Sequence, residues 1–233
     1  MEKQYLLPVS YMHTIKQLKG LILLFTIIFS FQSASAQFLI ISDIDDTIKE
    51  SSTLKFSRAV VRAFSSGHAV QNMAFLYHQL VSIPDSLIYY VSNAPYAVMG
   101  DSHDNFLEFN SFPRGFVHLR NIFDQPDEHK KVSLLKVITD VHPHQVLLIG
   151  DNASWDQQIY REIVGLFPSI KFYILIRDVN PDAPRFEDVD YFKTALDAAE
   201  ILYGKYILED RHLQNMIDQI PQSISFACEQ SFN

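Results

Sequence analysis

Short, mostly apolar runs recur along the chain, separated by longer segments whose apolar residues follow helical spacing. The runs are too short for ordinary helices and are rich in β-branched and aromatic residues, which predicts strands buried in a sheet. The predicted strands cover residues 38–41, 87–91, 116–119, 146–149 and 170–176.

The segments between these strands are expected to be helical. The predicted helices lie around 56–64, over 70–81, after Pro95 and over 130–140, with helical cover from about Tyr191 onward. Alternation of strands and helices is typical of parallel β-α-β units. We therefore predict an α/β fold with a doubly wound parallel sheet and a small cap or none, in which residues 48–67 would form the lid.

Residues 1–36 have the features of a signal peptide. Basic residues come first, 21–31 is an apolar run, and Ala34, Ser35 and Ala36 offer small side chains at the cleavage position. Cleavage would leave residues 37–233 as one domain, exported to the periplasm or secreted. The apolar run is shorter than a membrane span of about 20 residues, although an uncleaved anchor and a start at Met12 stay open.

Charge and cysteine content narrow the range of partners. The chain has 19 basic and 27 acidic residues, of which the leader holds three lysines and one glutamate, so residues 37–233 carry a net charge of −10. No basic stripe is available for nucleic acid, and docking onto anionic lipid by charge alone is disfavoured. Cys228 is the single cysteine, so the core must hold the fold without an internal disulfide.

Two carboxylates follow the first predicted strand. Asp43 and Asp45 are two residues apart, and residues i and i+2 of an extended chain point the same way. Two crowded acids are unfavourable unless a cation lies between them or they divide the roles of nucleophile and acid. A chance acidic turn is the alternative interpretation.

Polar residues also mark the ends of other strands. Ser92 follows the second strand, Asp151 follows the fourth, and Lys130 opens the helix before the fourth. Turn and capping preferences explain any one of them, but the carboxyl ends of parallel strands meet at one edge, where open α/β sheets bind ligands. The set suits hydrolysis of a phosphate monoester, which needs a nucleophile, an acid, and cations such as Mg²⁺ and lysine.

The pattern D-x-D-x-T after a hydrophobic strand resembles the signature of the haloacid-dehalogenase-like phosphohydrolases, which have a Rossmann-like core. More narrowly, the chain resembles the phosphatidate phosphatase catalytic domain of the actin-patch-associated phosphatase family. The matching stretches are SDIDDTIK (42–49), NMAFLYHQL (72–80), YVSNAPY (90–96), FPRG (112–115), HK (129–130), LLIGDNASWDQQIY (147–160) and IRDVNP (176–181). The chain departs from the family at Asn72, where the family has glycine.

This resemblance implies catalytic roles for three residues. Asp43 would be the nucleophile that becomes an aspartyl-phosphate, and it would also bind Mg²⁺. Asp45 would protonate the leaving group, activate the hydrolytic water and bind the metal through its backbone carbonyl. Lys130 would neutralise the phosphoryl charge, although the neighbouring Lys131 could take its place.

The remaining matches imply substrate and metal contacts. Ser92 and the backbone of Asn93 would bind a phosphoryl oxygen, while Asp151 and Asp156 would complete the Mg²⁺ site. Structural roles are expected for other polar residues, namely Thr47 in the loop, Asp101, His103 and Asp104 on a polar helix face, and the pair Arg177 and Asp178, for which a functional role stays open.

These features together predict an exported, Mg²⁺-dependent phosphatase that converts phosphatidate to diacylglycerol, with transient membrane contact and no nucleic-acid partner. Soluble phosphate esters, as used by exported acid phosphatases, are the alternative substrates. A binding protein that keeps the fold without catalysis would be expected to lack Asp43, Asp45 or Asp151, and all three are present.

Overall fold

The computed structural model of the chain describes residues 38–50, 68–121 and 123–219. Its first strand, β1 (Phe38–Ser42), is buried along its whole length. Leu39 and Ile41 pack into one apolar cluster, and Phe38 and Ile40 pack into another. The strand separates two cores, which is why its sequence is continuously apolar rather than alternating.

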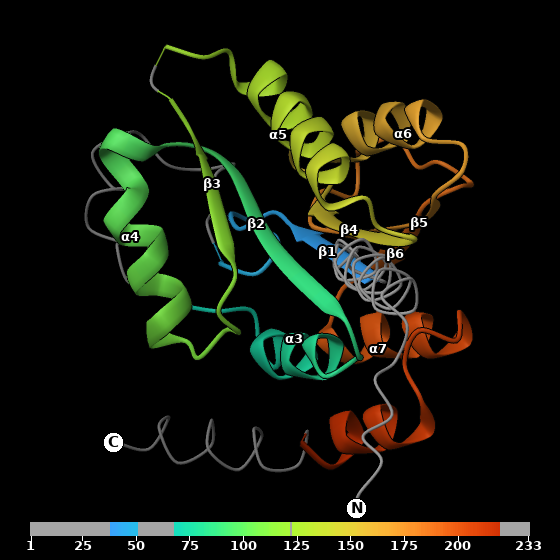
Figure 1. Cartoon of the computed structure of the whole chain (residues 1–233). Helices are drawn as coiled ribbons and strands as arrows, with labels where there is room; N and C mark the ends of the chain where they lie inside the picture. Colours follow the sequence, from blue (N-terminus) through green and yellow to red (C-terminus); the bar gives the residue numbers. More distant parts are fainter. Residues whose placement is uncertain (1–37, 51–67, 122, 220–233) are drawn as a thin grey trace, which may run out of the picture. The chain divides into compact units, whose positions relative to one another are not determined.

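Five further strands join β1 in one sheet in the order β3-β2-β1-β4-β5-β6, and all neighbours are parallel (Figure 1). They are β2 (Ser86–Pro95), β3 (Phe116–Arg120), β4 (Gln145–Asp151), β5 (Lys171–Arg177) and β6 (Asp190–Phe192). The six-stranded parallel sheet confirms the predicted α/β class.

Helices cover both faces of the sheet. In Figure 1, α5 (Pro126–Val141) and α6 (Asp156–Leu166) lie on one face, and α3 (Met73–Val81) and α7 (Ala195–Gly204) lie on the other. A further helix, α4 (Tyr96–Phe109), packs against β2 and β3. It buries Phe106 and Leu107 in the same core as α3 and α7. The sheet is therefore doubly wound, with one core on each face.

The chain builds the sheet outward from its centre in two directions. From β1 it runs through β2 to β3, then crosses to β4 on the other side of β1 and continues to β5 and β6. The direction of winding changes between β1 and β4. In open parallel sheets, ligands bind beyond the carboxyl ends of the strands at such a point.

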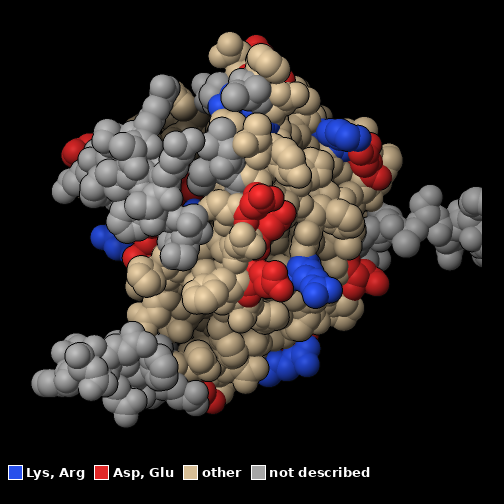
Figure 2. Space-filling model, turned by 90° about the vertical axis from the view of Figure 1, so that its left-hand side faces the viewer, with Lys and Arg blue, Asp and Glu red and all other residues tan. Residues whose placement is uncertain are grey.

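The open edge of the sheet next to α4 is the side shown in Figure 2. Acidic and basic side chains are scattered over this side, and most of the visible described surface is uncharged. Two aromatic side chains of α4 and β3, Phe109 and Phe116, are exposed.

The structure corrects several expected elements. β6 occupies residues where only helical cover was expected, since a three-residue strand is too short to show a period. α6 was not among the predicted helices. α3 begins at Met73 rather than at 70, because Asn72 has φ 62° and ψ 4°. Glycine favours this left-handed region and asparagine tolerates it, so Asn72 can adopt this conformation where most residues would be strained.

Some expectations lie outside the described residues. These are the signal peptide at 1–36, the helix around 56–64, most of the lid at 48–67, and Cys228. Within 38–50, 68–121 and 123–219, no helix combines the length and apolar character needed to span a bilayer.

Candidate active site

Carboxylates from two neighbouring strands meet where the winding changes direction. Asp43 directly follows β1, and its backbone N–H donates to the carbonyl of Ile149 in β4 at 2.9 Å. Asp151 is the last residue of β4. Parallel pairing thus continues past the end of β1 and brings together two aspartates that are distant in sequence.

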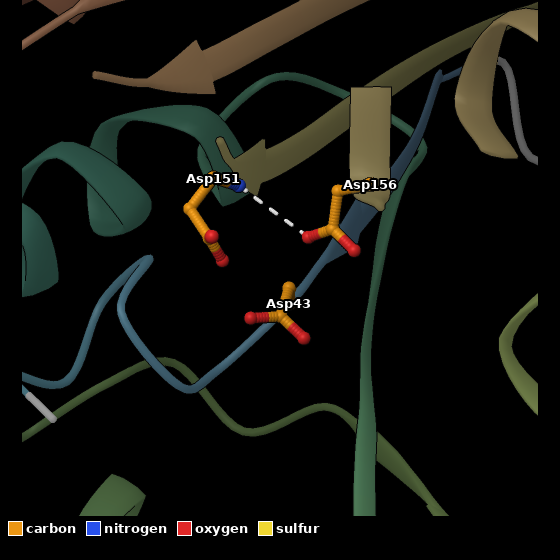
Figure 3. Close-up of side chains that lie close together, drawn as sticks. All are labelled: Asp43, Asp151 and Asp156. Atoms are coloured by element: carbon orange, nitrogen blue, oxygen red, sulfur yellow. Dashed lines mark hydrogen bonds between the residues drawn. The ribbon is translucent and has the colours of Figure 1, made fainter. Parts of the chain in front are cut away.

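A third aspartate completes a buried cluster (Figure 3). One carboxylate oxygen each from Asp43, Asp151 and Asp156 lies within 4.8 Å of the others, and none of the three residues is more than 5 % exposed. Asp156 begins α6, and its Oδ2 accepts the backbone N–H of Asp151 at 3.4 Å. Gly150 permits this approach, because a Cβ there would lie 2.5 Å from Asp156 Oδ2. The cluster contains three of the four predicted metal ligands.

Lys130 places a positive charge against this cluster. Its Nζ donates to Asp43 Oδ1 at 2.8 Å and pairs with Asp156 Oδ1. The lysine is buried and lies on α5, the crossover between β3 and β4. Lys131, the alternative, pairs with Glu162 at the surface at 2.6 Å. The structure therefore brings Lys130 rather than Lys131 to the aspartates.

Hydroxyl and backbone donors orient the carboxylates. The buried Thr47 has its Oγ1 at 3.2 Å from Asp43 Oδ2 and at 3.2 Å from Asp151 Oδ2. Ala153 and Ser154 donate backbone N–H groups to Asp151 Oδ1 at 2.7 and 3.2 Å. Thr47 thus links the loop after β1 to the end of β4.

The cluster sets three acids against one lysine. Burial raises the pKa of Asp43 well above its usual 3.8, despite the attraction of Lys130. Burial, together with the charge of Asp156, raises the pKa of Asp151 to about 7. Burial alone would lower the pKa of Lys130, but its attraction to Asp156 and Asp43 raises it. Three ionised acids would outnumber the one lysine, and a hard divalent cation would balance their charge and displace the protons that the raised pKa values retain.

Asp45 lies in a different environment. Its Oδ2 accepts a hydrogen bond from Ser92 Oγ at 3.2 Å and lies 3.1 Å from His103 Nε2. Its side chain is 29 % exposed, against 6 % for Asp43. Burial opposes ionisation of Asp45, but its hydrogen bond to His103 and the charge of that histidine outweigh burial and lower its pKa. The pKa values of the two aspartates that follow β1 are thus shifted in opposite directions.

His103 was not predicted at this site. It was expected on a polar helix face with Asp101 and Asp104, and that expectation is wrong for His103, which is fully buried while the two aspartates are exposed. The spacing of His103 from apolar residues in the sequence could have indicated its burial. His103 precedes the buried Phe106 and Leu107 by three and four residues, the separation of neighbours on one helix face.

The end of β2 brings the predicted substrate contacts next to Asp45. Ser92 is buried, and its Oγ also accepts the N–H of Ala94 at 3.0 Å. The register with β3 shifts between Ser92 and Pro95, an irregularity that often redirects side chains beside active sites. The buried Asn93 Oδ1 has no hydrogen-bond partner in the described part of the chain. Such an unpartnered atom is costly, and it lies beside the predicted substrate contacts.

Arg177 and Asp178 contact neighbouring loops. Arg177 donates from Nη1 to the carbonyl of Asp46 at 2.8 Å. Asp178 accepts from Asn152 Nδ2 at 2.8 Å and from Arg185 Nη1 at 2.9 Å. These contacts tie together the loops that follow β1, β4 and β5.

Sequence comparison relates this chain to a known family. The profile of the family "Phosphatidate phosphatase APP1, catalytic domain" matches residues 38–178, a range that contains every predicted catalytic, substrate-binding and metal-binding residue. The uncharacterized protein C29B5.04c of Schizosaccharomyces pombe is 29 % identical over 154 residues, which are 61 % of this chain and 25 % of that protein. The chain thus spans about a quarter of the length of the curated relative it matches.

Two solved structures of a Pnkp1/Rnl/Hen1 complex, one titled as an RNA repair complex, each contain a chain similar to this one. The first has a TM-score of 0.48 and 13 % identity, covering 64 % of this chain and 45 % of that chain. The second has a TM-score of 0.47 and 13 % identity, covering 61 % and 47 %. At this distance the likeness does not bear on activity.

Proposed function

Because this chain belongs to the family of the phosphatidate phosphatase APP1 catalytic domain, we propose that it hydrolyses phosphatidate to diacylglycerol and inorganic phosphate. Enzymes of this family are phosphoric monoester hydrolases. The observation that carries the proposal is the buried cluster of Asp43, Asp151 and Asp156 against Lys130. It lies within the matched residues, at the point of the sheet where ligands are expected.

Mg²⁺ is the proposed cofactor, held by Asp43, Asp151, Asp156 and the backbone carbonyl of Asp45. Buried carboxylate oxygens within 4.8 Å of one another are the hard ligands that this ion prefers. When bound, it would offset the charge of the phosphoryl oxygens and weaken their repulsion by the nucleophile. The excess of acids over lysine in the cluster supports this assignment.

Asp43 is the proposed nucleophile. One of its carboxylate oxygens attacks phosphorus, the bond from phosphorus to the glycerol oxygen breaks, and Asp45 donates a proton to the departing alkoxide. In the second step Asp45 takes a proton from water, the water oxygen attacks phosphorus, and the acyl phosphate bond to Asp43 breaks. Lys130 balances the charge of Asp43 and the phosphoryl group, while Ser92 and the backbone of Asn93 bind phosphoryl oxygens.

This reaction is the one expected of haloacid-dehalogenase-like phosphohydrolases, and we place the chain among them as part of the proposal. The D-x-D-x-T pattern at residues 43–47 supports the placement. So do the different environments of Asp43 and Asp45, because two carboxylates of one site can divide the roles of nucleophile and of acid and base.

Exposed aromatic side chains at the carboxyl edge of the sheet support a lipid substrate. Tyr96, Phe123 and Trp155 follow β2, β3 and β4, and are 67 %, 89 % and 61 % exposed. Aromatic residues favour the boundary between water and lipid. Transient contact of these side chains with a phospholipid surface is proposed, since a net charge of −8 provides little attraction to anionic lipid.

The activity test is phosphate release by the purified full chain with Mg²⁺, from dispersed phosphatidate and from p-nitrophenyl phosphate. We expect release from phosphatidate that stops when EDTA removes the metal and in the Asp43→Asn variant. Turnover of the soluble ester alone would contradict the lipid assignment and favour a phosphatase for soluble esters. A folded protein that turns over neither ester would contradict the phosphatase proposal.

The membrane contact has a built-in probe, because Trp155 is the chain's one tryptophan. Its fluorescence is expected to shift to shorter wavelength with vesicles of phosphatidate in phosphatidylcholine. In the Phe123→Ser variant, we expect a higher lipid concentration to be needed for the same shift. Vesicles that are hydrolysed without any shift would contradict contact through these side chains.

Export is the remaining part of the proposal, supported by the leader at residues 1–36. Mass spectrometry of protein recovered from the producing cells should find Gln37 at the N-terminus. An intact leader on the active protein would contradict cleavage and favour an uncleaved anchor.

A further inference from the structure

We infer that His103 is a positioning residue that holds the carboxylate of Asp45 in place for proton transfer to the leaving group. The inference rests on the proposed function, since it concerns the same reaction. His103 Nε2 and Ser92 Oγ both contact Asp45 Oδ2, at 3.1 and 3.2 Å. Two contacts from α4 and β2 on one oxygen set the rotation of the carboxylate, leaving Oδ1 for the substrate.

The burial of His103 shows what the side chain contributes. It is 0 % exposed and lies on the face of α4 that also buries Phe106 and Leu107. An imidazole loses hydration at such a position, and an apolar side chain would not. Packing alone therefore does not account for a histidine there, whereas a hydrogen bond to a carboxylate does.

A second contact joins α4 to the same loop. Lys49 is buried, and its Nζ lies 5.4 Å from the centre of the Phe106 ring. The backbone of Lys49 forms isolated bridges with Asp45 and with Ala69. His103 and Phe106, one turn apart on α4, thus hold the loop from Asp45 to Lys49 at both ends.

The need for a positioned acid depends on the leaving group. The alkoxide released from phosphatidate is strongly basic and requires a proton, whereas p-nitrophenolate is weakly basic and leaves without one. Misplacing Asp45 should therefore slow cleavage of the alkyl ester more than cleavage of the aryl ester. In this two-step scheme kcat/KM contains only the steps up to departure of the leaving group, so the later attack of water does not affect it.

The test compares kcat/KM of the full chain with Mg²⁺ on dioctanoyl phosphatidate and on p-nitrophenyl phosphate. For His103→Phe we expect the value for phosphatidate to fall about 10- to 100-fold more than the value for the aryl ester. His103→Gln keeps a donor, so its ratio of the two kcat/KM values should stay closer to that of the wild type. Asp45→Asn should show the largest preference for the aryl ester. The ratio of the two values does not depend on the folded fraction of a variant.

His212→Phe is the matched control. His212 is also buried, with Nε2 at 3.3 Å from Ser82 Oγ, in the helix at 210–219, so its replacement should leave the ratio unchanged. If His103→Phe yields no folded protein, His103→Asn replaces it, because the shorter amide withdraws its donor from Asp45. Equal loss on both esters, or no loss, in an active enzyme would overturn only this inference. A wild type inactive on both esters would overturn the proposed function and the inference with it.

Discussion

Asp43 and Asp45 leave the same strand two residues apart, yet they occupy opposite environments. The Asp43 side chain is 6 % exposed and lies against two further acids and Lys130. The Asp45 side chain is 29 % exposed and contacts His103 and Ser92. The pKa of Asp43 is raised and that of Asp45 is lowered. The difference shows that burial and neighbouring charges, rather than residue type, set the pKa of a carboxylate.

The two sides also differ in what they are suited to hold. The Asp43 side gathers oxygen ligands and a lysine around a small volume, which suits a cation and a phosphoryl group. The Asp45 side offers a partly solvated carboxylate held by Ser92 and His103, which gives it access to water for proton exchange.

Neutralising each acid should produce the largest and most distinct effects. With p-nitrophenyl phosphate, Asp45→Asn should release one nitrophenolate for each active site and then stall, because this leaving group needs no acid while the acyl phosphate still needs a base. Asp43→Asn should release none, with steady-state activity lower by about 10⁴-fold or more. Rapid-mixing absorbance measures the burst, and borohydride reduction of the acyl phosphate identifies the phosphorylated aspartate. A burst from the Asp43→Asn variant would show that Asp43 is not the nucleophile.

Removing the buried lysine should destabilise the Asp43 side. In EDTA at pH 8, Lys130→Met is expected to cost about 3–5 kcal/mol of unfolding free energy, because the buried acids lose their cation. Lys131→Met is the matched control and should change stability by less than about 0.5 kcal/mol, since its pair with Glu162 is exposed. Urea unfolding measures both, and Mg²⁺ should restore part of the loss. Equal stability of the two variants would show that the cluster does not depend on Lys130.

The raised pKa of Asp151 predicts that its contribution to stability falls with rising pH in EDTA, whereas the stabilisation by Mg²⁺ grows with rising pH. Between the usual pKa of 3.8 and the value of about 7, Asp151 binds more protons in the folded protein than in the unfolded chain, whereas His118, His129 and His212, whose pKa values burial lowers, bind fewer. In EDTA, the melting temperature of the wild type relative to an Asp151→Asn variant should therefore fall as pH rises through this window. Mg²⁺ must displace those protons to bind, so its affinity should fall about tenfold per pH unit for each proton as pH falls below 7. The increase in melting temperature that Mg²⁺ causes should shrink accordingly. An increase that is the same at pH 5.5 and pH 8 would contradict binding by these acids.

The smallest effects should come from the neutral donors on each side. Thr47→Val removes a hydroxyl that lies between two buried carboxylates and should cost about 1–2 kcal/mol. Ser92→Ala should cost less, because Asp45 keeps contact with His103 and with solvent. Urea unfolding in EDTA compares the two. A larger cost for Ser92→Ala would reverse the comparison between the two environments.

Strand ends could be predicted from the sequence, and neighbours across the sheet could not. Asp43, Asp151 and Lys130 were expected near one another because each stands at the end or start of an element on one edge. The contact of α4 with Asp45 through His103 was missed, since a histidine flanked by acidic residues is typical of a solvent-exposed helix face. β6 and α6 were missed because one is very short and the other has few apolar residues at its start.

The sequence by itself determined the alternation of strands and helices and the chemistry at each strand end. Strands buried on both faces must be continuously apolar, and turns after them admit acids and hydroxyls, so both features have a local signature. Only the tertiary structure decided which of these groups touch. The reversal of winding beside β1 pairs Asp43 with Asp151, the rotation of α5 selects Lys130 over Lys131, and the rotation of α4 buries His103 against Asp45. Strand order and helix rotation depend on packing across the whole core, and no single segment records them.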